Sequence, residues 1–312
     1  MIVGRVQQIW RHAVKSMAGE KLEDCEVTAK GIPGDRGWAV RDETTGEITN
    51  GKRIPLLMQC RATYRFPPAA GVNTEVDIVL SDGTVTATDD TEVHAHLSRV
   101  FGKPVTLWPL QPATATEFYR RTGASARIAG RLTRFSGFRS LLPTLTSFGT
   151  MNRQMREMFS REQGEPIPDL SKMPQEVFEY TSPLGTYFDA FPINLLTTAS
   201  LQAMARYNPT AIWDVRRFRP NFVVETVGDL EGLVEAGWAD RAIRLGGVEL
   251  KLEIPCARCG MTTHAQEGLP KDPSVLRSVV KDANQNMGIY ANVISAGRVR
   301  VGDDVELINK VR

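Results

Sequence analysis

The sequence predicts a mainly β protein with helices, of the α+β class, in which two strand-rich parts flank an insertion. Two observations support this prediction. Short runs of alternating, β-branched residues, separated by Gly, Asp, Asn and Pro, fill both the first and the last third of the chain. Between them the composition changes abruptly and becomes rich in arginine. We therefore expect a strand-rich domain over residues 1–110, a helical or loop insertion over 111–180 and a second domain over 181–312.

The first third contains a series of candidate strands followed by one candidate helix. Alternating patterns predict strands at residues 3–10, 26–31, 37–42, 60–66, 76–81 and 84–88. Short strands at this spacing are typical of a barrel or a curled sheet. The helix is predicted over 91–102, with Asp90 or Thr91 as its N-cap and Gly102 at its end.

The insertion contains the one strongly basic region of the chain. Phe135, Phe138, Leu141 and Leu142 alternate there with arginines, and no Asp or Glu lies among Arg120, Arg121, Arg127, Arg131, Arg134, Arg139, Arg153 and Arg156. A helix is predicted from Ser147 to Gln163, followed by a proline-broken loop. The arginines indicate either a docking face for an acidic partner protein or a solvated helical lid.

The last third returns to strands, with two helices among them. Strands are predicted at 221–226, 242–256, 289–295 and 298–308, interrupted by tight turns at Gly246-Gly247 and Gly302-Asp303. The first helix is predicted at 198–207 and the second at 272–283. Asp272 suits the N-cap of the second helix, and Pro273 occupies a first-turn position where a missing N–H costs nothing.

Length and composition exclude several classes of protein. A chain of 312 residues exceeds what one core usually holds, so two domains, or one domain with a large insertion, are expected. The formal net charge of +2, with 24% charged and 42% hydrophobic residues, is typical of a soluble globular protein. No apolar run approaches the roughly 18 residues of a transmembrane segment, and no targeting leader is visible, so we expect a cytoplasmic protein. No recognition motif accompanies the arginines, so nucleic acid is not an expected partner.

The two cysteines in the stretch EIPCARCGMTTH, Cys256 and Cys259, raise the question of chemistry. Zinc needs four ligands, and His264 is the one histidine near the pair in sequence. A thioredoxin-like pair normally opens a helix, whereas this stretch follows a strand into a loop. Buried, inert packing is another interpretation. A fourth interpretation is that one cysteine is a thiolate, a form that the positive charge of Arg258 favours, and that it ligates a soft metal whose other ligands come from a cofactor.

Motifs at both ends of the chain resemble one family. The family consists of proteins that join an N-terminal β-barrel to a molybdenum cofactor sulfurase C-terminal (MOSC) domain, and it includes the mitochondrial amidoxime-reducing component. The matching motifs near the start are IWRHAVKSMAGE, GIPGDRGWAV and NGKRIPLL. The matching motifs toward the end are FDAFPINLLTTASL, RFRPNFVVE, WADRAIRLGGVELKLEIPCARCGMTT and GRVRVGDDVEL. The resemblance implies an N-terminal MOSC β-barrel domain and a C-terminal MOSC β-barrel domain, and it does not cover residues 111–180.

The resemblance also implies a set of site residues. Cys259 matches the thiolate that ligates molybdenum and serves as the catalytic residue, whereas Cys256 matches a position that often holds Cys or another small residue and is not expected to be a ligand. The cofactor-binding positions that match are Lys15, Ser16, Arg36, Arg219, Asn221, Arg258, Thr198 and Thr263. Lys and Arg suit an anionic pterin phosphate and dithiolene. The competing interpretations are that Lys15 and Arg36 are solvated surface charges, and that Arg219 pairs with Asp214. Asp35 is expected to orient Arg36 or to cap a turn.

The implied function is that of a molybdenum-dependent oxidoreductase. The resemblance implies that Mo-molybdopterin is the cofactor and that small N-hydroxylated compounds such as amidoximes, hydroxylamines or N-oxides are reduced. The sequence has no cysteine-rich extension for an iron–sulfur domain and no glycine-rich nucleotide fingerprint, so a separate reductase or small redox carrier is the expected electron donor. The alternatives are a molybdenum cofactor carrier or a sulfur-transfer protein that uses a Cys259 persulfide, and a non-catalytic binding module.

Overall fold

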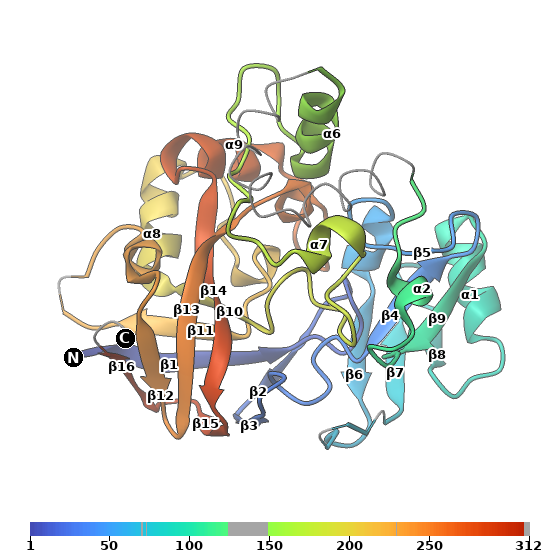
Figure 1. The fold of residues 1–312 in the computed structure, drawn as a ribbon, viewed down its shortest axis with the longest axis horizontal. Coiled ribbons are helices and arrows are strands. Elements are labelled where there is room, and N and C mark those ends of the chain that lie inside the picture. Colours follow the sequence, from blue (N-terminus) through green and yellow to red (C-terminus); the bar gives the residue numbers. More distant parts are fainter. Residues whose placement is uncertain (70, 73, 124–148, 229, 309–312) are drawn as a thin grey trace.

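The computed structural model describes residues 1–69, 71–72, 74–123, 149–228 and 230–308 (Figure 1). A closed seven-stranded β-barrel forms its larger part, and this confirms the predicted mainly β, α+β class. Around the barrel the strand order is β1, β11, β10, β14, β13, β12, β16 and back to β1. The strands are β1 (Ile2–Arg11), β10 (Ile193–Thr197), β11 (Phe222–Thr226), β12 (Ala242–Leu245), β13 (Val248–Ala257), β14 (Asn286–Ser295) and β16 (Asp304–Ile308).

The N-terminal strand closes this barrel. β1 pairs antiparallel with β11 on one side and with β16 on the other, although most of the barrel comes from the last third of the chain. The short strand β2 (Glu20–Leu22) extends the sheet beside β1. The domain boundaries near residues 110 and 180 stay a prediction, but by its pairings β1 is part of the barrel.

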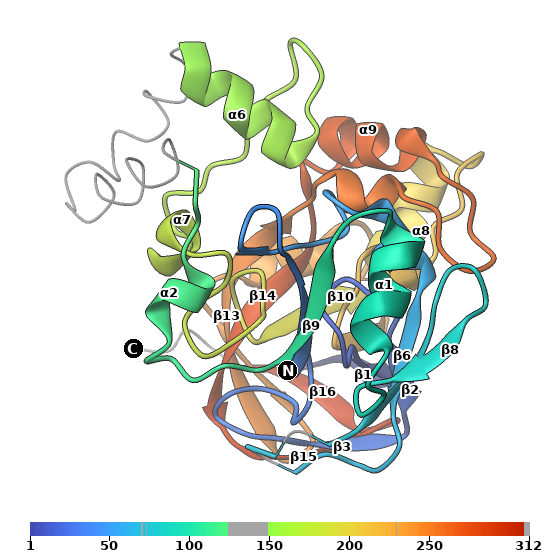
Figure 2. The ribbon, with the colours of Figure 1, turned by 90° about the vertical axis from the view of Figure 1, so that its right-hand side faces the viewer.

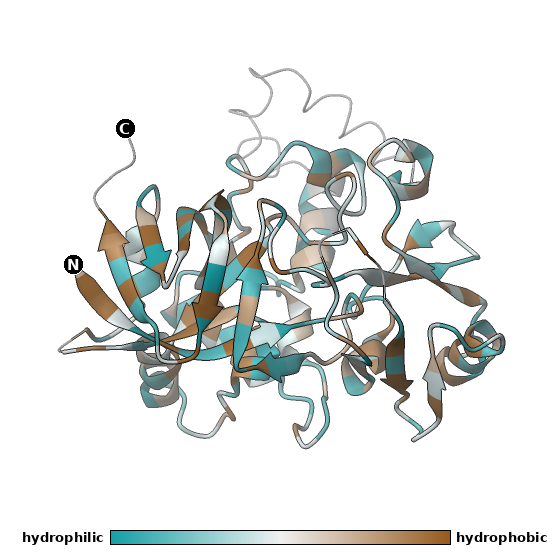
Figure 3. Ribbon diagram, turned by 90° about the horizontal axis from the view of Figure 1, so that it is seen from below, coloured by the Kyte–Doolittle hydropathy of each residue, from teal (hydrophilic) through white to brown (hydrophobic). Residues whose placement is uncertain are grey.

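Alternating side chains fill the barrel interior. In β13, Val248, Leu250 and Leu252 are fully buried while the residues between them are partly exposed, as the two-residue period of a strand requires. Brown and teal alternate along the barrel strands in Figure 3 for the same reason. Beyond Leu252 the register between β13 and β14 shifts around Pro255, and such irregularities redirect side chains. Cys256 is the second-last residue of β13, and Cys259 lies two residues beyond the end of this strand.

The rest of the first third forms a second body with its own core, to the right of the barrel in Figure 1. One of its three-stranded sheets contains β4 (Trp38–Asp42), β5 (Glu47–Ile48) and β9 (Val105–Pro109). The other contains β6 (Arg61–Tyr64), β7 (Val76–Val79) and β8 (Val85–Ala87), and the 3-10 helix η1 (Pro55–Gln59) precedes it. A separate ladder pairs β3 (Asp24–Val27) with β15 (Gly297–Arg300).

Helix α1 (Val93–Phe101) confirms the predicted helix and its end, because Gly102 adopts the left-handed conformation. The predicted cap is wrong. Glu92 occupies the N-cap position without a side-chain cap, and Asp90, two residues earlier, accepts a hydrogen bond from the Glu92 N–H at 2.9 Å. Helices α8 (Thr198–Tyr207) and α9 (Pro273–Asp282) lie where they were predicted, and Asp272 caps α9 by accepting from the Ser274 N–H.

The middle segment contains three further described helices, α2 (Thr116–Tyr119), α6 (Gly149–Phe159) and α7 (Glu176–Glu179). The helix predicted up to Gln163 ends earlier, at Phe159, because Ser160 adopts a left-handed φ of 53°. α6 lies at the same end of the molecule as α9 (Figure 2). Arg127, Arg131, Arg134 and Arg139, with Phe135, Phe138, Leu141 and Leu142, lie outside the described residues.

Three short 3-10 helices complete the described structure: η2 (Val215–Arg217), η3 (Val234–Trp238) and η4 (Gly260–Thr263). η4 begins directly after Cys259, so the cysteine stretch is a strand that runs into a single tight turn. In the part of the chain that the structure describes, no helix combines the length and the hydrophobicity that a bilayer span requires.

Candidate functional site

A pocket lies where the second body meets the barrel, and seven of the nine predicted site residues line it. We call the part contributed by the first third of the chain the first wall, with Lys15, Ser16 and Arg36. The second wall comes from the last third, with Arg219, Asn221, Arg258 and Cys259. Residues separated by about two hundred positions in sequence therefore share one site.

The backbone is unusual at three of these residues. Ser16, Arg36 and Arg219 adopt left-handed φ angles of 69°, 51° and 51°, a region that residues other than glycine seldom occupy. Such conformations persist where the surrounding structure enforces them, and they cluster at ligand sites. The Ser16 hydroxyl accepts a hydrogen bond from the Gly51 N–H at 3.0 Å, which ties this turn to the predicted NGKRIPLL stretch.

Asp35 connects the two walls. Its Oδ2 accepts hydrogen bonds from the Arg36 guanidinium and from Asn221 Nδ2, the latter at 2.9 Å. Its Oδ1 accepts from the His12 N–H at 2.8 Å. The prediction that Asp35 orients Arg36 is confirmed, and Asp35 positions Asn221 as well.

Lys15 is a buried cation rather than a solvated one. Its side chain is 5% exposed, and Nζ donates to the Tyr187 carbonyl at 2.8 Å and to Asp189 Oδ1 at 2.9 Å, with Ser182 Oγ and the Phe188 carbonyl close by. Burial lowers the pKa of Lys15, and the attraction of Asp189 opposes that shift. The alternative that Lys15 is a surface charge is wrong, because four acceptors surround its ammonium group. Arg36, whose side chain is 14% exposed, is likewise mostly covered.

Asp189 brings a carboxylate to a pocket whose walls are otherwise cationic. Its side chain is 68% exposed, so it faces the open part of the pocket. Loss of solvation in the pocket raises the pKa of Asp189. The positive charge and the hydrogen bond of Lys15 lower this pKa by more, so the net shift is downward. The Asp189 carboxylate is therefore ionised at neutral pH.

Arg219 has a donor without a partner. Its Nη1 donates to the Met17 carbonyl, while Nη2 is buried and makes no hydrogen bond. Burial, together with the nearby charge of Arg36, lowers the pKa of Arg219 to about 9. The alternative pairing with Asp214 is wrong, because that carboxylate binds Arg216, two residues along the chain.

Arg258 lies between the two cysteines in sequence, and its guanidinium contacts the first of them. Its Nη2 donates to the Phe218 carbonyl at 2.6 Å, and its Nη1 lies 3.0 Å from the sulfur of Cys256. Cys256 is 1% exposed, and burial raises the pKa of its thiol although Arg258 opposes the shift. Cys259 is partly exposed and lines the pocket. The two cysteines therefore differ: one packs into the interior and the other presents its sulfur to a ligand.

Unpaired polar atoms concentrate at this pocket. Six buried side-chain polar atoms lack a hydrogen-bond partner in the part of the chain that the structure describes. Three of them belong to lining residues, namely Arg219 Nη2, Arg258 Nε and Asn194 Oδ1. A buried polar group without a hydrogen-bond partner destabilises the fold. The concentration of such groups here therefore indicates a site where a bound ligand supplies the missing partners. Two of the three are guanidinium donors, which favours an anion.

Two predicted residues do not line the pocket. The hydroxyl of Thr198, at the start of α8, accepts a hydrogen bond from the Thr226 N–H and so joins the helix to β11. Thr263 donates to the Gly260 carbonyl at 2.8 Å within the turn, while its neighbour Thr262 lines the pocket. In the described residues, no group of three or more His, Cys, Asp or Glu side chains is placed to hold a metal ion.

Sequence reasoning missed several residues of the site. Asp189 lies within the quoted motif FDAFPINLLTTASL, so the signal was present, but a carboxylate did not fit the expected anion site. Arg217 is 1% exposed and donates to the carbonyls of Thr262 and Pro270, which fixes the turn after Cys259. Arg217 is the first residue of the quoted motif RFRPNFVVE, and its partly exposed neighbour Arg216 lies just outside it, so a signal was present here too.

The described arginines of the insertion already have partners within the chain. Arg120 pairs with Glu117 and Glu179, and Arg153 lies 3.8 Å from Glu157. Arg121 donates to the Val177 carbonyl, and Arg156 donates to Asn152. The docking of an electron donor on this region stays a prediction.

Comparison with known proteins gives two family matches. Residues 3–108 match the MOSC N-terminal beta barrel domain, and residues 185–306 match the MOSC domain. The chain is 27% identical over 326 residues to mitochondrial amidoxime reducing component 2 of Bos taurus, covering 97% of the chain and 83% of the relative. It is 25% identical to mitochondrial amidoxime-reducing component 1 of Mus musculus, covering 99% and 83%. These relatives are named as mitochondrial, so the cytoplasmic location of this chain stays a prediction.

The chain is also similar to solved structures. The similarity to the YUAD protein from Bacillus subtilis covers 99% of this chain and 97% of that protein, at 14% identity and a TM-score of 0.43. A shorter similarity, over 39% of this chain, is to YiiM from Escherichia coli, at 14% identity and a TM-score of 0.31.

Proposed function

We propose, from the premise that this chain belongs to the MOSC domain proteins that carry the MOSC N-terminal β-barrel domain, that it is a molybdenum-dependent reductase of N-hydroxylated compounds. The observation that carries the proposal is the convergence of Cys259 with two unpaired guanidinium donors, those of Arg219 and Arg258, in one pocket. The names of the relatives, which are amidoxime-reducing components, support the choice of substrate class.

The pocket residues fit Mo-molybdopterin by their chemistry. The phosphate and dithiolene of this cofactor are anionic, and the free Nη2 of Arg219 and Nε of Arg258 are donors that lack an acceptor. Lys15, Ser16 and Arg36 of the first wall would add further charge and hydrogen bonds. Cys259 would supply the protein sulfur to the metal, because its side chain is partly exposed and lines the pocket.

When bound, the cofactor would supply two-electron redox chemistry, and the protein would supply position, charge and protons. Reduction of an N-hydroxyl group to N–H consumes two electrons and two protons and releases water. Arg219 and Arg258 would stabilise negative charge as oxygen departs. The electrons would come from a separate reductase or small redox carrier.

The test is metal and pterin analysis of the full chain purified from a host that makes the cofactor. Turnover of benzamidoxime is then measured with a chemically reduced viologen as the electron source. About one molybdenum per chain together with amidine formation supports the proposal. Metal-free protein, or loaded protein without turnover, contradicts it. Loaded protein that lacks turnover but carries a persulfide on Cys259 would instead favour the carrier or sulfur-transfer alternative.

A further inference from the structure

The segment Ser160–Glu165, which follows α6, contacts the turn that carries Cys259. Neither family domain covers this segment, since the matches end at residue 108 and resume at 185. Arg161 is its buried residue, at 6% exposure. Its Nη2 donates to the Arg258 carbonyl at 2.9 Å, and that carbonyl belongs to the peptide bond joining Arg258 to Cys259.

Gln285 completes a ring of hydrogen bonds around Arg258. Arg161 Nε donates to Gln285 Oε1 at 3.2 Å, and the Arg258 N–H donates to the Gln285 backbone carbonyl at 2.9 Å. The N–H of Arg258 is therefore bound by Gln285 and its carbonyl by Arg161, and these two partners are hydrogen-bonded to each other. The remaining Nη1 of Arg161 donates to the Phe159 carbonyl at 2.9 Å, which fixes the guanidinium to its own segment.

Ser160 packs closely against the cysteine turn. A Cβ built on Gly260, the residue after Cys259, would clash with Ser160 Oγ, so a larger residue there would force Ser160 to shift. Ser160 itself adopts a left-handed φ of 53°, so the chain turns sharply at the point of contact. The segment is thus pressed against both neighbours of Cys259, Arg258 through Arg161 and Gly260 through Ser160.

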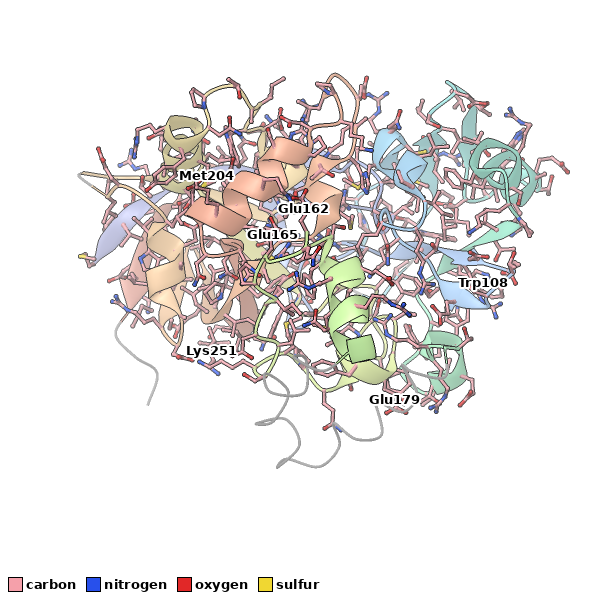
Figure 4. The ribbon with its side chains drawn as sticks, turned by 90° about the horizontal axis from the view of Figure 1, so that it is seen from above. Trp108, Glu162, Glu165, Glu179, Met204 and Lys251 are labelled. Carbon is pink, nitrogen blue, oxygen red and sulfur yellow. The ribbon has the colours of Figure 1, made fainter. Side chains whose placement is uncertain are left out.

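Helix α9 holds the other side of the segment. Arg277 of this helix pairs with Glu165 at 2.5 Å and donates to the Ser160 carbonyl at 2.5 Å, with Glu162 at 3.4 Å. Figure 4 shows Glu162 and Glu165 beside α9. The segment is therefore anchored independently of the pocket, and Arg161 reaches the cysteine turn from a fixed base.

The position of Arg161 also has an electrostatic consequence. Burial lowers the pKa of Arg161, and the negative charges of Glu165 and of a Cys259 thiolate oppose that shift. An arginine keeps its proton at neutral pH, so a buried positive charge lies beside the turn that carries Cys259.

We propose that Arg161 is a positioning residue that fixes the Arg258–Cys259 peptide, so that the sulfur of Cys259 is held in place from the insertion side. The structural part of this proposal stands on the contacts above, and its catalytic consequence rests on the proposed reductase function. Arg161 acts through Cys259 and does not line the pocket.

The first test is hydrogen exchange of the cofactor-free protein, followed by mass spectrometry. In Arg161→Gln, the peptide covering residues 256–263 should exchange about 10-fold faster, because a charge-assisted hydrogen bond to its backbone is lost. Arg161→Lys keeps the charge without the planar fork and should give an intermediate rate. The matched control is Arg153→Gln, which removes an exposed arginine of α6 and should leave the rate unchanged. Equal rates in wild type and both Arg161 variants would overturn the proposal.

A second variant addresses the same contact from the other side. Gly260→Ala adds a methyl group against Ser160 and should also accelerate exchange of residues 256–263 while barrel peptides stay protected. If Arg161→Gln instead loosens the whole barrel, Arg161→Lys and Gly260→Ala decide the matter. Local acceleration in either supports the proposal, and its absence in both overturns it.

The catalytic consequence is measured on the molybdenum-loaded protein. Arg161→Gln should lower kcat per bound molybdenum about 10-fold with little change in KM, and Arg161→Lys should recover part of the loss. A normal kcat per molybdenum with a lowered melting temperature would show a purely structural role and overturn the catalytic part. Absence of turnover in the wild type would contradict the proposed function. It would not affect the positioning role of Arg161, which the hydrogen-exchange experiment tests separately.

Discussion

The two walls of the pocket differ in how completely their polar groups are paired. On the first wall, Lys15 has four acceptors around its ammonium group and Arg36 binds Asp35. On the second wall, Arg219 and Arg258 each keep a buried nitrogen without a partner, and Cys259 presents a partly exposed sulfur. The first wall is therefore arranged before any ligand arrives, whereas the second wall is completed by the ligand. Binding energy should accordingly be concentrated on the second wall.

The largest expected effect separates the two cysteines of the second wall. Cys259→Ser should lower turnover at least ~100-fold, because the proposed metal ligand is lost. Cys256→Ser is the matched control, since this thiol is 1% exposed and packs into the interior. It should retain most turnover per molybdenum while it lowers stability. The measurement is amidine formation per bound metal, and similar losses in both variants would contradict the assignment.

The next effect breaks the link between the walls. Asp35→Asn removes a fully buried carboxylate that binds both Arg36 and Asn221. We expect the free energy of unfolding to fall by about 3 kcal/mol, because an arginine is left without its counter-charge. Chemical denaturation of the cofactor-free protein measures this loss. Asp214→Asn, which disturbs a half-exposed pair with Arg216, is the control and should change stability by less than about 1 kcal/mol.

A smaller effect tests where the ligand binds. Arg219→Gln removes an unpaired donor from the second wall and should weaken retention of the cofactor about 10-fold or more. Arg216→Gln, three residues earlier, changes an arginine that pairs with Asp214 outside the proposed contacts and should leave retention unchanged. Pterin content after dialysis is the measurement. Equal pterin loss from the two variants would mean that the unpaired donor is not part of the site.

The smallest effect concerns pH. The folded-state pKa of Asp189 is depressed, so its charge contributes stability that is present above its unfolded pKa near 3.9 and is lost as pH falls through the folded pKa. Because the carboxylate is 68% exposed, Asp189→Asn should cost at most about 1 kcal/mol at neutral pH. The difference between wild type and variant should shrink below about pH 4. A difference that grows on acidification would show that the sign is wrong.

Much of the fold could be predicted because local signals and tertiary structure agree. Helices α8 and α9 begin and end where their caps and apolar periods indicate, and the turn at Gly246-Gly247 joins two alternating strands. The closure of the barrel by β1 was not predictable in the same way. Pairing between strands at opposite ends of a chain leaves no local trace in either of them.

The site was predictable to the extent that motifs mark it. Lys15, Arg36, Arg219 and Cys259 lie in motifs and meet in one pocket. The role of Arg161 could not be derived, because its partners Arg258 and Gln285 are about a hundred positions away and its own segment matches no motif. Thr198 lies in a motif but serves the packing of α8 on β11, so a motif position alone does not define a contact.

The pairing of Ile2 with Glu306 also constrains how the chain acquires its structure. During synthesis β1 leaves the ribosome long before one of its two neighbours, β16, which is made some three hundred residues later. Contacts this distant in sequence form slowly, so the edge of β1 that pairs with β16 stays unpaired until the last strand has been translated. Cutting the chain after the first matched domain, at residue 108, would remove β1 from the C-terminal fragment. In that fragment β11 and β16 would then be unpaired edge strands, which promote aggregation.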